Sequence, residues 1–290
     1  MNKCNLCPRA CNIDRSKSQG FCGSNDKIKI GKVMLHNWEE PILAEKNSGA
    51  IFFSNCPLKC IFCQNYEISQ NGKGREVSID ELVDIIKDLE KRGAENIDLV
   101  SPTQYVDQIV EALKIYKPSV PVVWNSNGYE TEESLEKLRG VVDIFLPDFK
   151  YASDKVSIEY SKCKDYFEKT SKAILKMREL QPVDEFKNDK LIKGVIIRHL
   201  VLPGNYLNTK LVLKWIKNNL GINTIISIMS QYTPYYLAKE HNVLNRGLTD
   251  KEYSKVENLV FDMGFENGFL QELNSADECY IPDFEQHLTD

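Results

Sequence analysis

The sequence of 290 residues contains no apolar run near the roughly 20 residues that a membrane-spanning helix requires. Its first residues also lack the apolar core of a secretory signal. The net charge is −5, from 37 basic and 42 acidic side chains, so no basic field is available to neutralise a nucleic-acid backbone. Internal repeats and low-complexity tracts are missing as well. We therefore expect a folded, cytoplasmic protein with no membrane partner and no nucleic-acid partner.

Cysteine, by contrast, is abundant, because the chain has nine. A reducing compartment argues against disulfides and in favour of metal binding or catalysis. Seven of the nine fall within the first 63 residues, and these are Cys4, Cys7, Cys11, Cys22, Cys56, Cys60 and Cys63. The cysteines are therefore the main functional signal in the sequence.

The composition changes near residue 48. Residues 1–48 are rich in cysteine but poor in large apolar side chains, so this segment needs a metal to hold it together. Two short strands are expected within it, Lys27–Ile30 and Lys32–Leu35. We expect a metal-binding segment over residues 1–48 and a larger domain over residues 49–290, whose C-terminal part closes over the site.

From Gly49 onward, short apolar runs alternate with helical patterns. Runs that are apolar almost throughout are typical of strands covered on both faces, and they are Ala50–Ser54, Asn96–Val100, Val120–Asn125, Val141–Pro147, Gly194–Leu200 and Thr224–Met229. The helical patterns are Ser78–Arg92, Gln104–Tyr116, Thr131–Leu138, Tyr160–Gln181, Lys210–Asn219 and Thr249–Met263. Ser78 and Thr249 each have the spacing of a capping box, with a glutamate three residues later.

Six strand–helix units in series predict an α/β fold with a parallel sheet and right-handed crossovers. Six units are too few for an eightfold barrel, and a partial, open (β/α)6 barrel fits better than a doubly wound sheet. In either fold, ligands gather at the carboxyl ends of the strands. Polar groups follow five of these strands, at Ser101–Thr103, Asn125–Gly128, Asp148–Lys150, Arg198–His199 and Gln231. They predict a site at that edge.

Three cysteines directly follow the first of these strands, at Cys56, Cys60 and Cys63. Three thiolates at C-x3-C-x2-C spacing suit three corners of a cubane iron–sulfur cluster and leave its fourth iron open. The spacing alone leaves two alternatives. One is a zinc site completed by a distant ligand, and the other is a four-cysteine cluster completed by Cys163 or Cys279.

The C-x3-C-x2-C motif at the end of the first strand of a β/α protein resembles the radical S-adenosylmethionine (SAM) superfamily. The aromatic residue before the last cysteine, Phe62, matches as well. The segments NCPLKCIFCQN, WEEP, LPDFKY and RHLVLPG together resemble the pyruvate formate-lyase activating enzyme-like proteins. This likeness runs from Cys4 to about Phe284.

The resemblance implies a radical SAM enzyme, with a 4Fe–4S cluster on Cys56, Cys60 and Cys63 whose open iron binds SAM. One electron then splits SAM into methionine and a 5′-deoxyadenosyl radical, which abstracts a hydrogen atom from a substrate. It further implies a flavodoxin- or ferredoxin-type electron donor. The family name suggests a protein substrate, a glycine of a partner glycyl-radical enzyme, while a small metabolite or a peptide stays open as the substrate.

The same resemblance identifies cofactor-binding candidates, which are Phe62, Ser101, Thr103, Asn125, Asn127, Asp148, Lys150 and Arg198. Phe62 is placed beside the adenine, and the two asparagines reach the ribose. Lys150 and Arg198 are the catalytic candidates, because a guanidinium fork suits the SAM carboxylate and Lys150 suits that carboxylate or the substrate. Each has a plainer alternative, as a turn, a surface ion pair or a structural arginine.

The second strand departs from the pattern of the superfamily. A Gly-Gly-Glu-like segment usually ends this strand and holds the SAM amino group. Here the sequence reads Leu99-Val100-Ser101-Pro102-Thr103, so backbone carbonyls and the Thr103 hydroxyl must substitute.

The N-terminal segment offers a second set of thiolates, at Cys4, Cys7, Cys11 and Cys22. Four thiolates suit a tetrahedral zinc site or a second iron–sulfur cluster. Zinc would act as a structural staple or a docking knuckle, whereas a cluster would indicate an electron relay. The sequence leaves both open.

Several other residues receive weaker expectations. His199 lies on the strand face opposite Arg198 and is expected to pack in the core, whereas His36 is expected to face either the site or the core. Aromatic or polar candidates for the cavity wall are Tyr232, Tyr235, Tyr236 and Gln271. Cys163 is expected to have no role, and Cys279 belongs to the closing C-terminal segment.

Two other function classes compete with the enzyme. A non-enzymatic iron–sulfur or zinc protein would carry electrons or dock a partner, but it has no use for a polar cleft at the strand ends. A thiol oxidoreductase would place a C-x2-C pair at a helix start without further metal-like cysteines, and Cys60 with Cys63 meets only the spacing.

Overall fold

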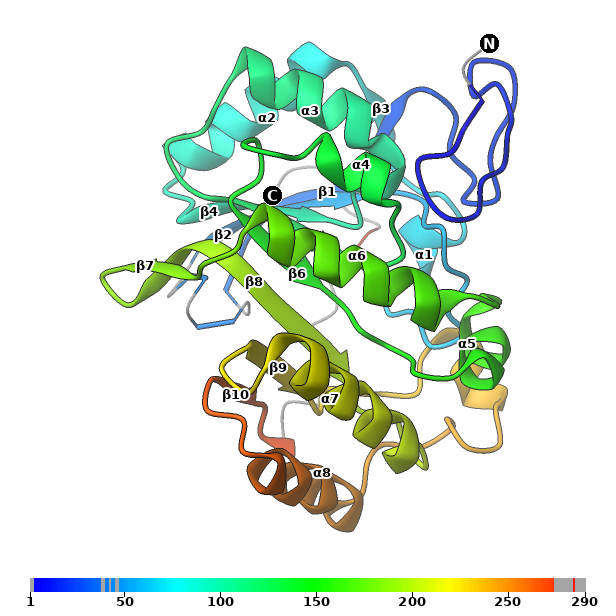
Figure 1. The fold of residues 1–290 in the computed structure, drawn as a ribbon. Coiled ribbons are helices and arrows are strands. Elements are labelled where there is room, and N and C mark those ends of the chain that lie inside the picture. The colour runs from blue at the N-terminus through cyan, green and yellow to red at the C-terminus, as the bar shows by residue number, and fades with distance from the viewer. Residues whose placement is uncertain (1–2, 38–39, 42, 45–46, 274–283, 285–290) are drawn as a thin grey trace.

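Ten strands form one sheet in the order β10-β9-β8-β6-β5-β4-β2-β1-β3, and β7 pairs with the first residues of β8 (Figure 1). The computed structural model describes residues 3–37, 40–41, 43–44, 47–273 and 284. The strands are β1 (Ile28–His36), β2 (Ser48–Phe53), β3 (Arg75–Val77), β4 (Asn96–Val100), β5 (Val122–Ser126), β6 (Ile144–Pro147), β7 (Glu185–Lys187), β8 (Lys190–Leu200), β9 (Ile225–Met229) and β10 (Gly268–Leu270).

The sheet is parallel from β2 through β4, β5, β6, β8 and β9 to β10. Only β1, β3 and β7 add antiparallel pairs in the described part of the chain. The two ends of the strand order, β10 and β3, are not paired with each other among the described residues, so the barrel stays open. The expected partial, open β/α barrel is confirmed.

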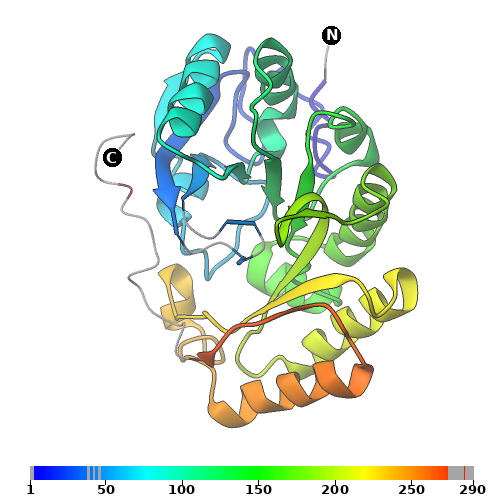
Figure 2. The same ribbon diagram turned by 90° about the vertical axis from the view of Figure 1, so that its left-hand side faces the viewer.

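Helices surround the curved sheet, and the longer of them cover its outer face (Figure 2). They are α1 (Tyr66–Ser69), α2 (Ile79–Lys91), α3 (Val106–Ile115), α4 (Glu132–Glu136), α5 (Asp154–Ser161), α6 (Tyr166–Leu180), α7 (Tyr206–Leu220) and α8 (Asp250–Met263), with two 3-10 helices, η1 (Thr103–Tyr105) and η2 (Tyr236–Glu240). Both capping boxes form as expected: Ser78 caps α2 and Thr249 caps α8.

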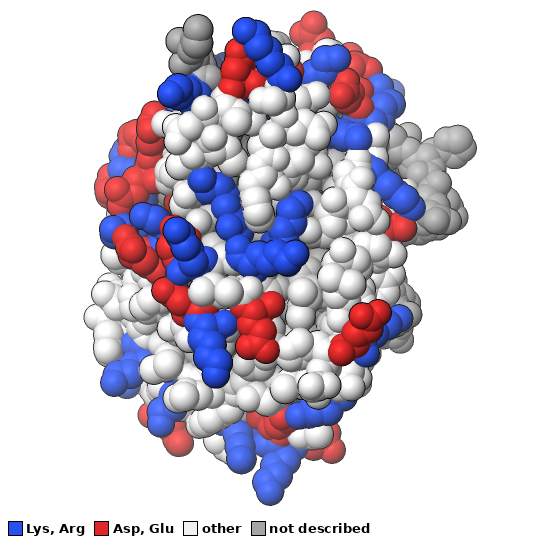
Figure 3. Space-filling view, turned by 90° about the vertical axis from the view of Figure 1, so that its right-hand side faces the viewer, with Lys and Arg blue, Asp and Glu red and all other residues white. Residues whose placement is uncertain are grey.

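The N-terminal segment, residues 3–27, lies at one side of the barrel (Figure 1). It contacts α4, where the Ser134 hydroxyl donates to the Leu6 carbonyl at 2.8 Å. It also contacts α3, where Gln108 donates to the Asp26 carbonyl at 2.7 Å. A group of Lys and Arg side chains lies near the centre of the molecular face on this side (Figure 3).

The single long helix expected over Tyr160–Gln181 is wrong, because the chain forms α5 and α6 there. Lys162 ends α5 in a left-handed conformation, with a φ of 51°. The Ser157 hydroxyl then donates to the Cys163 carbonyl and stabilises the turn. The break matters for the site, because it holds Ser161 beside the cysteine loop.

The two short strands expected in the N-terminal segment form one strand, β1. The register with β2 shifts between Ile30 and Lys32, so a bulge at Gly31 allows the strand to continue. A Cβ atom at Gly31 would lie 2.4 Å from the Ile68 side chain, so a larger residue does not fit there. Because β1 pairs with β2, the sheet runs across residue 48.

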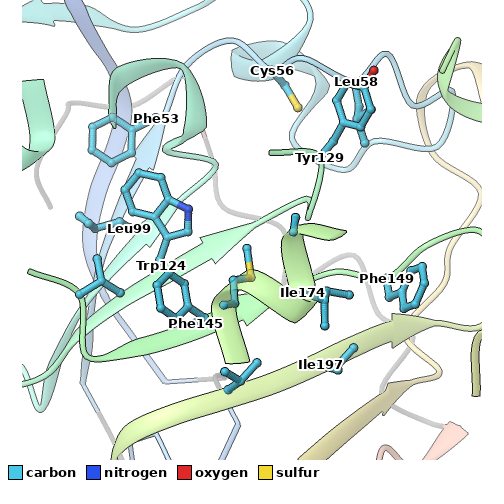
Figure 4. Close-up of a cluster of buried hydrophobic side chains, with 14 of the residues drawn as sticks. Phe53, Cys56, Leu58, Leu99, Trp124, Tyr129, Phe145, Phe149, Ile174 and Ile197 are labelled. Atoms are coloured by element: carbon cyan, nitrogen blue, oxygen red, sulfur yellow. The ribbon is translucent and has the colours of Figure 1, made fainter. Parts of the chain in front are cut away.

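An apolar core fills the space between the sheet and the outer helices. Trp124 and Phe145 pack there with Leu99, Ile174 and Ile197, and each of the five is at most 1% exposed (Figure 4). Burial of large side chains of this kind contributes about 1.5–3 kcal/mol each. This core fixes the strands whose carboxyl ends carry the polar groups.

Alternate residues of the same strands point to the inner face of the barrel. An apolar cluster there contains Leu43, Val123, Ile144, Leu146, Leu191, Ile196 and Ile225. Two residues further along β5, β6 and β8 the same face becomes polar, at Asn125, Asp148 and Arg198. The inside of the barrel is therefore closed by apolar side chains below and lined by polar groups at the carboxyl ends.

Candidate active site

The C-x3-C-x2-C motif lies in the loop that follows β2. Asn55 begins this loop with a φ of 71°, a left-handed conformation that asparagine tolerates better than most residues. Two backbone hydrogen bonds then tie the loop to the end of α5. The Lys59 amide donates to the Ser161 carbonyl at 3.2 Å, and the Ile61 amide donates to the Tyr160 carbonyl at 2.9 Å. The loop is therefore fixed against the barrel.

Each of the three sulphurs has a polar neighbour. The pairs are Asn127 Nδ2 with Cys56 Sγ (3.4 Å), Ser161 Oγ with Cys60 Sγ (2.9 Å) and Ser69 Oγ with Cys63 Sγ (3.1 Å). Ser161 is itself held by the Tyr151 hydroxyl at 2.6 Å. Hydrogen bonds of this kind orient thiolate ligands and set the reduction potential of an iron–sulfur cluster.

The raised pKa values of these three thiols argue against a reactive, nucleophilic thiol. Burial, with a contribution from the nearby Cys60, raises the pKa of Cys56 to about 12 and that of Cys63 to about 11. Burial also raises the pKa of Cys60. A thiol with a raised pKa is a poor nucleophile, whereas a bound metal displaces its proton. Three such thiols in one loop fit three irons of a cubane cluster, which argues against the thiol oxidoreductase.

A cavity opens beside the cysteines at the carboxyl ends of the parallel strands, and all three cysteines line it. It brings together seven of the eight predicted cofactor-binding residues, which are Phe62, Ser101, Asn125, Asn127, Asp148, Lys150 and Arg198. Gln231, at the end of β9, lines it as well. Polar residues from five strand ends therefore converge on the cysteine loop, as the sequence predicts.

Asp148 bridges the two cations of the cavity. Its Oδ2 accepts from Lys150 Nζ at 2.6 Å, and its Oδ1 accepts from Arg198 Nε at 3.2 Å. Burial alone would raise the pKa of the Asp148 carboxyl, but Lys150 and Arg198 outweigh it and hold this pKa below its usual range. The three groups carry a net charge of +1, which suits an anionic group of a ligand.

Asn125 is held in one orientation by two charged neighbours. Its Oδ1 accepts from a terminal nitrogen of Arg198, and its Nδ2 donates to Asp98 Oδ2 at 3.1 Å. Asp98 is 1% exposed, so this bond is shielded from water. The amide therefore positions the guanidinium together with Asp148.

Ser101 reaches the cavity, whereas Thr103 lies outside its lining. Ser101 has a φ of 56°, and its amide donates to the Asn125 carbonyl at 2.8 Å. The Thr103 hydroxyl instead donates to Glu130 Oε1 at 3.1 Å and is 1% exposed. The structure thus places Thr103 in a buried network behind the cavity.

Two buried residues of this region carry no motif that would have predicted them. Glu130 accepts hydrogen bonds from Thr103, from the Trp124 indole (2.7 Å) and from Ser126 (2.8 Å), and burial raises its pKa despite these donors. The Tyr166 hydroxyl lies 2.7 Å from the carbonyl of Asp148 and 2.9 Å from that of Asn127, and accepts from the Lys150 amide at 3.0 Å. Tyr166 therefore joins the ends of β5 and β6.

The aromatic candidates divide into two groups. Phe62 and Tyr232 both line the cavity, with their rings edge to face at 6.0 Å. Tyr235 and Tyr236 pack instead on Tyr66, at ring distances of 5.7 and 4.6 Å. Gln271 reaches the cavity only indirectly, because it donates to Gln231 at 3.2 Å.

The two histidines on β1 and β8 differ in environment. His36 lines the cavity, and burial together with the nearby Arg198 lowers its pKa. His199 is buried on the other face of β8, with Nδ1 2.7 Å from the Phe149 carbonyl and Nε2 2.9 Å from the Thr209 hydroxyl. Burial lowers the pKa of His199 to about 4, so it is neutral, and its expected packing role is confirmed.

The second group of thiols gathers within the N-terminal segment. A Cβ atom at Gly20 would lie 3.5 Å from Cys22 Sγ and 3.6 Å from Cys11 Sγ, so these two sulphurs lie close to the same point. Cys4, Cys7 and Cys11 are half-buried and Cys22 is buried. Among the described residues, no three side chains of His, Cys, Asp or Glu lie close enough together to hold a single metal ion.

Some expected features fall outside the described residues. Cys279 and most of the closing C-terminal segment belong to this part, as do the first two residues of the WEEP segment. Phe284 is described, and its ring contacts Phe52 of the cavity lining at 6.0 Å. No helix in the described part of the chain is long and apolar enough to cross a membrane.

Comparison with known proteins agrees with this geometry. A family model described as the radical SAM superfamily matches residues 50–216. These residues include the cysteine loop and four of the five polar strand ends, and the fifth, at Gln231, follows them. An uncharacterized protein of Methanocaldococcus jannaschii is 36% identical over 269 residues, which cover 89% of this chain and 74% of that protein.

Solved structures share the fold at low sequence identity. Streptococcus suis SuiB bound to the precursor peptide SuiA has a TM-score of 0.51 and 14% identity, covering 76% of this chain and 48% of that one. HydG from Carboxydothermus hydrogenoformans has a TM-score of 0.50 and 15% identity, covering 78% and 54%. A structure of anSMEcpe with bound SAM and a peptide has a TM-score of 0.50 and 15% identity, covering 72% of this chain and 57% of that one. This chain spans about half the length of these solved proteins.

Proposed function

Because this chain belongs to the radical SAM superfamily, we propose that Cys56, Cys60 and Cys63 ligate its 4Fe–4S cluster and that the adjoining cavity binds SAM. The family implies an enzyme that cleaves SAM by radical chemistry. One observation carries the assignment to residues: the three thiols line the same cavity as the Asp148-bridged pair of Lys150 and Arg198.

The reduced cluster and SAM together supply a 5′-deoxyadenosyl radical that abstracts a hydrogen atom. The protein's part is to bind and orient. Arg198 binds the SAM carboxylate through its guanidinium fork, while Asn125 and Asp148 hold that fork in place. Lys150, on the other oxygen of Asp148, binds the same carboxylate or the substrate.

The cavity wall near the cysteines suits the remainder of SAM. Phe62 lies beside the last cysteine, 7% exposed, and is proposed to pack against the adenine. The ribose is assigned to Asn125 and Asn127, and the backbone at Ser101 to the SAM amino group. Leu58 and Tyr232, at most 2% exposed, keep water away from the cysteines. A dry site protects a reactive radical from side reactions.

The cluster assignment is tested with a matched pair of cysteine variants. We expect Cys60→Ser to lose the SAM-sensitive 4Fe–4S signal in electron paramagnetic resonance (EPR) of the reduced protein. Cys163→Ser should keep that signal, because Cys163 is buried outside both cysteine groups and contacts Asp165. Addition of SAM should change the signal of the wild-type protein. A SAM-sensitive signal of full intensity in Cys60→Ser would contradict the assignment.

We further propose that the substrate is a protein or peptide, with a glycine of a glycyl-radical enzyme as the specific candidate. The support is the resemblance to activating enzyme-like proteins, together with a shared fold with SuiB, whose structure holds a precursor peptide. The test is EPR of a candidate glycyl-radical enzyme after incubation with this protein, SAM and a reductant. A glycyl-radical doublet is expected. Turnover of a small metabolite without any doublet would contradict the proposal.

The electron donor is proposed to be a flavodoxin or a ferredoxin, which are acidic one-electron carriers. The side of the molecule that carries the N-terminal segment presents a group of Lys and Arg side chains (Figure 3), and a basic surface suits an acidic partner. There the Arg9 guanidinium lies 4.0 Å from the centre of the Phe21 ring, and Lys59 Nζ lies 5.8 Å from it. Phe21 is 44% exposed.

A further inference from the structure

We propose that Cys4, Cys7, Cys11 and Cys22 hold a second iron–sulfur cluster, through which one electron reaches the cluster at Cys56, Cys60 and Cys63. The inference rests on the proposed function of the first site. The N-terminal segment would then hold a metal site, and the electron would enter the protein there.

The chain folds around the four thiols in a manner suited to a cluster. The Cys4 amide donates to the Ile13 carbonyl at 2.8 Å, and the Asn12 amide returns a bond to the Cys4 carbonyl at 2.9 Å. Ala10 and Asn12 have φ values of 42° and 54°, so the backbone turns sharply on both sides of Cys11. Such left-handed residues persist where the surroundings compensate their cost.

Backbone amides point at the sulphurs. The Phe21 amide lies 3.3 Å from Cys11 Sγ, and the Ser24 amide lies 3.4 Å from Cys22 Sγ. Amide donors to sulphur stabilise thiolates and tune the potential of iron–sulfur clusters.

The buried side of this group touches the loop of the first cluster. The Ser24 hydroxyl donates to the Tyr105 hydroxyl at 3.3 Å, and Asn55 Nδ2 donates to the same oxygen at 3.1 Å. Since the Ser24 amide also contacts Cys22 Sγ and Asn55 precedes Cys56, hydrogen bonds and covalent bonds connect the two sites without a gap. This continuity brings the N-terminal thiols against the loop of the first cluster, as an electron path between two clusters requires.

A second contact joins the two segments. Arg9 Nε donates to the Pro57 carbonyl at 2.9 Å, directly after Cys56. A Cβ atom at Gly23 would lie 3.0 Å from Asn55 Oδ1, so the N-terminal segment lies against the loop on both sides of Cys56.

The opposite side of the group faces solvent. Cys4, Cys7 and Cys11 are half-buried, whereas Cys22 is buried. The exposed Phe21 and its cationic neighbours lie at the border between this group and the loop of the first cluster, because Arg9 contacts Pro57 and Lys59 belongs to that loop. From the protein surface inward, the groups on the path are therefore the half-buried N-terminal thiols, then Cys22, Asn55 and Cys56. A reduced flavodoxin would give one electron to a cluster held by the N-terminal thiols, and this cluster would pass the electron to the cluster at Cys56, Cys60 and Cys63 and so return to its oxidised state.

The metal content is tested on the whole chain, reconstituted without oxygen. Wild-type protein should contain about eight irons and eight sulfides per chain, and the double variant Cys4→Ser/Cys7→Ser about four of each. The matched control, Cys163→Ser, should keep about eight. EPR of the reduced wild type should show one signal that SAM changes and one that it does not, with the second missing from the double variant.

Zinc with about four irons in the wild type would overturn the second cluster, and this count needs no variant to fold. The electron path is tested by the rate at which reduced flavodoxin reduces the SAM-sensitive cluster. We expect a loss of about tenfold or more in the double variant. An unchanged rate, with that cluster fully loaded, would overturn the relay.

The proposed cleavage of SAM is tested separately from the second cluster. Dithionite reduces exposed and buried clusters alike, so wild type and double variant should both form 5′-deoxyadenosine with it. A wild type that forms none would count against SAM cleavage. The iron count and the flavodoxin reduction rate would still decide whether the second cluster exists and carries the electron.

Discussion

The substitution Arg198→Ala tests the binding role of the cavity directly. Arg198 lies at the carboxyl half of β8, where its guanidinium contacts both Asp148 and Asn125. Its side chain is 15% exposed, so its charge acts in a largely desolvated site. The alanine variant would leave Asp148 paired with Lys150 at 2.6 Å. The remaining pair of Asp148 and Lys150 would then have no net charge and would no longer attract the SAM carboxylate.

The size of the effect follows from the contacts that the guanidinium can make. Hydrogen bonds to a charged group contribute about 1.5–3 kcal/mol each, and the fork offers two in parallel. A loss of about 3 kcal/mol would weaken SAM binding about 150-fold. Isothermal titration of the reconstituted protein with SAM, without oxygen, measures this change. Iron content should stay at the wild-type value, because Arg198 is not among the proposed cluster ligands.

A second arginine provides the control. Arg178 pairs with Asp184 at 2.9 Å, and its side chain is 20% exposed, so this pair resembles the Arg198 pair in distance and burial. Arg178 also donates to the Val195 carbonyl, away from the cavity lining. Arg178→Ala should reduce stability and leave SAM affinity unchanged. Unchanged SAM affinity in a folded Arg198→Ala protein would refute the binding role.

Three further predictions concern buried groups. His199→Asn should flatten the pH dependence of the free energy of unfolding measured with urea, because the pKa of His199 in the folded protein, about 4, lies below the ordinary 6.5. His199 therefore contributes about 3 kcal/mol to the free energy of unfolding above pH 6.5, and this contribution is lost as the pH falls to 4. The control variant His241→Asn should keep the pH dependence of the wild type. Glu130→Leu leaves three buried donors unpaired and should lower the free energy of unfolding by about 3 kcal/mol or more, whereas an equal loss in Glu130→Gln would argue against hydrogen bonding as the cause. Ser161→Ala removes the neighbour at 2.9 Å from the Cys60 sulphur and should make the cluster potential more negative in an EPR redox titration; an unaltered potential would exclude that role.

The parallel sheet could be predicted from the sequence because its signals are local. Each inner strand is a short run of apolar residues, and the helices between the strands carry their own caps at Ser78 and Thr249. The polar residues at strand ends could then be placed together, because parallel strands put their carboxyl ends on one edge. Period-two alternation also separated Arg198, in the cavity, from His199, in the core.

Residues that act from the helices could not be predicted. Tyr166 and Ser161 reach the site only because α5 and α6 pack on particular strands, and neither carries a local motif. The break between these helices was missed because the apolar pattern continues across it, while the left-handed Lys162 interrupts the backbone. Thr103 was expected in the cavity on its position after β4, but the chain turns into η1 there and directs its hydroxyl to Glu130.

The formation of 5′-deoxyadenosine tests the central claim most directly. Wild-type protein, reconstituted with iron and sulfide, is mixed with SAM and dithionite without oxygen, and the products are measured by mass spectrometry. We expect 5′-deoxyadenosine and methionine from the wild type and from Cys163→Ser, and none from Cys60→Ala. A loaded, reducible wild type that binds SAM but forms no 5′-deoxyadenosine, with or without a glycyl-radical enzyme, would contradict it. So would formation at the wild-type rate by Cys60→Ala.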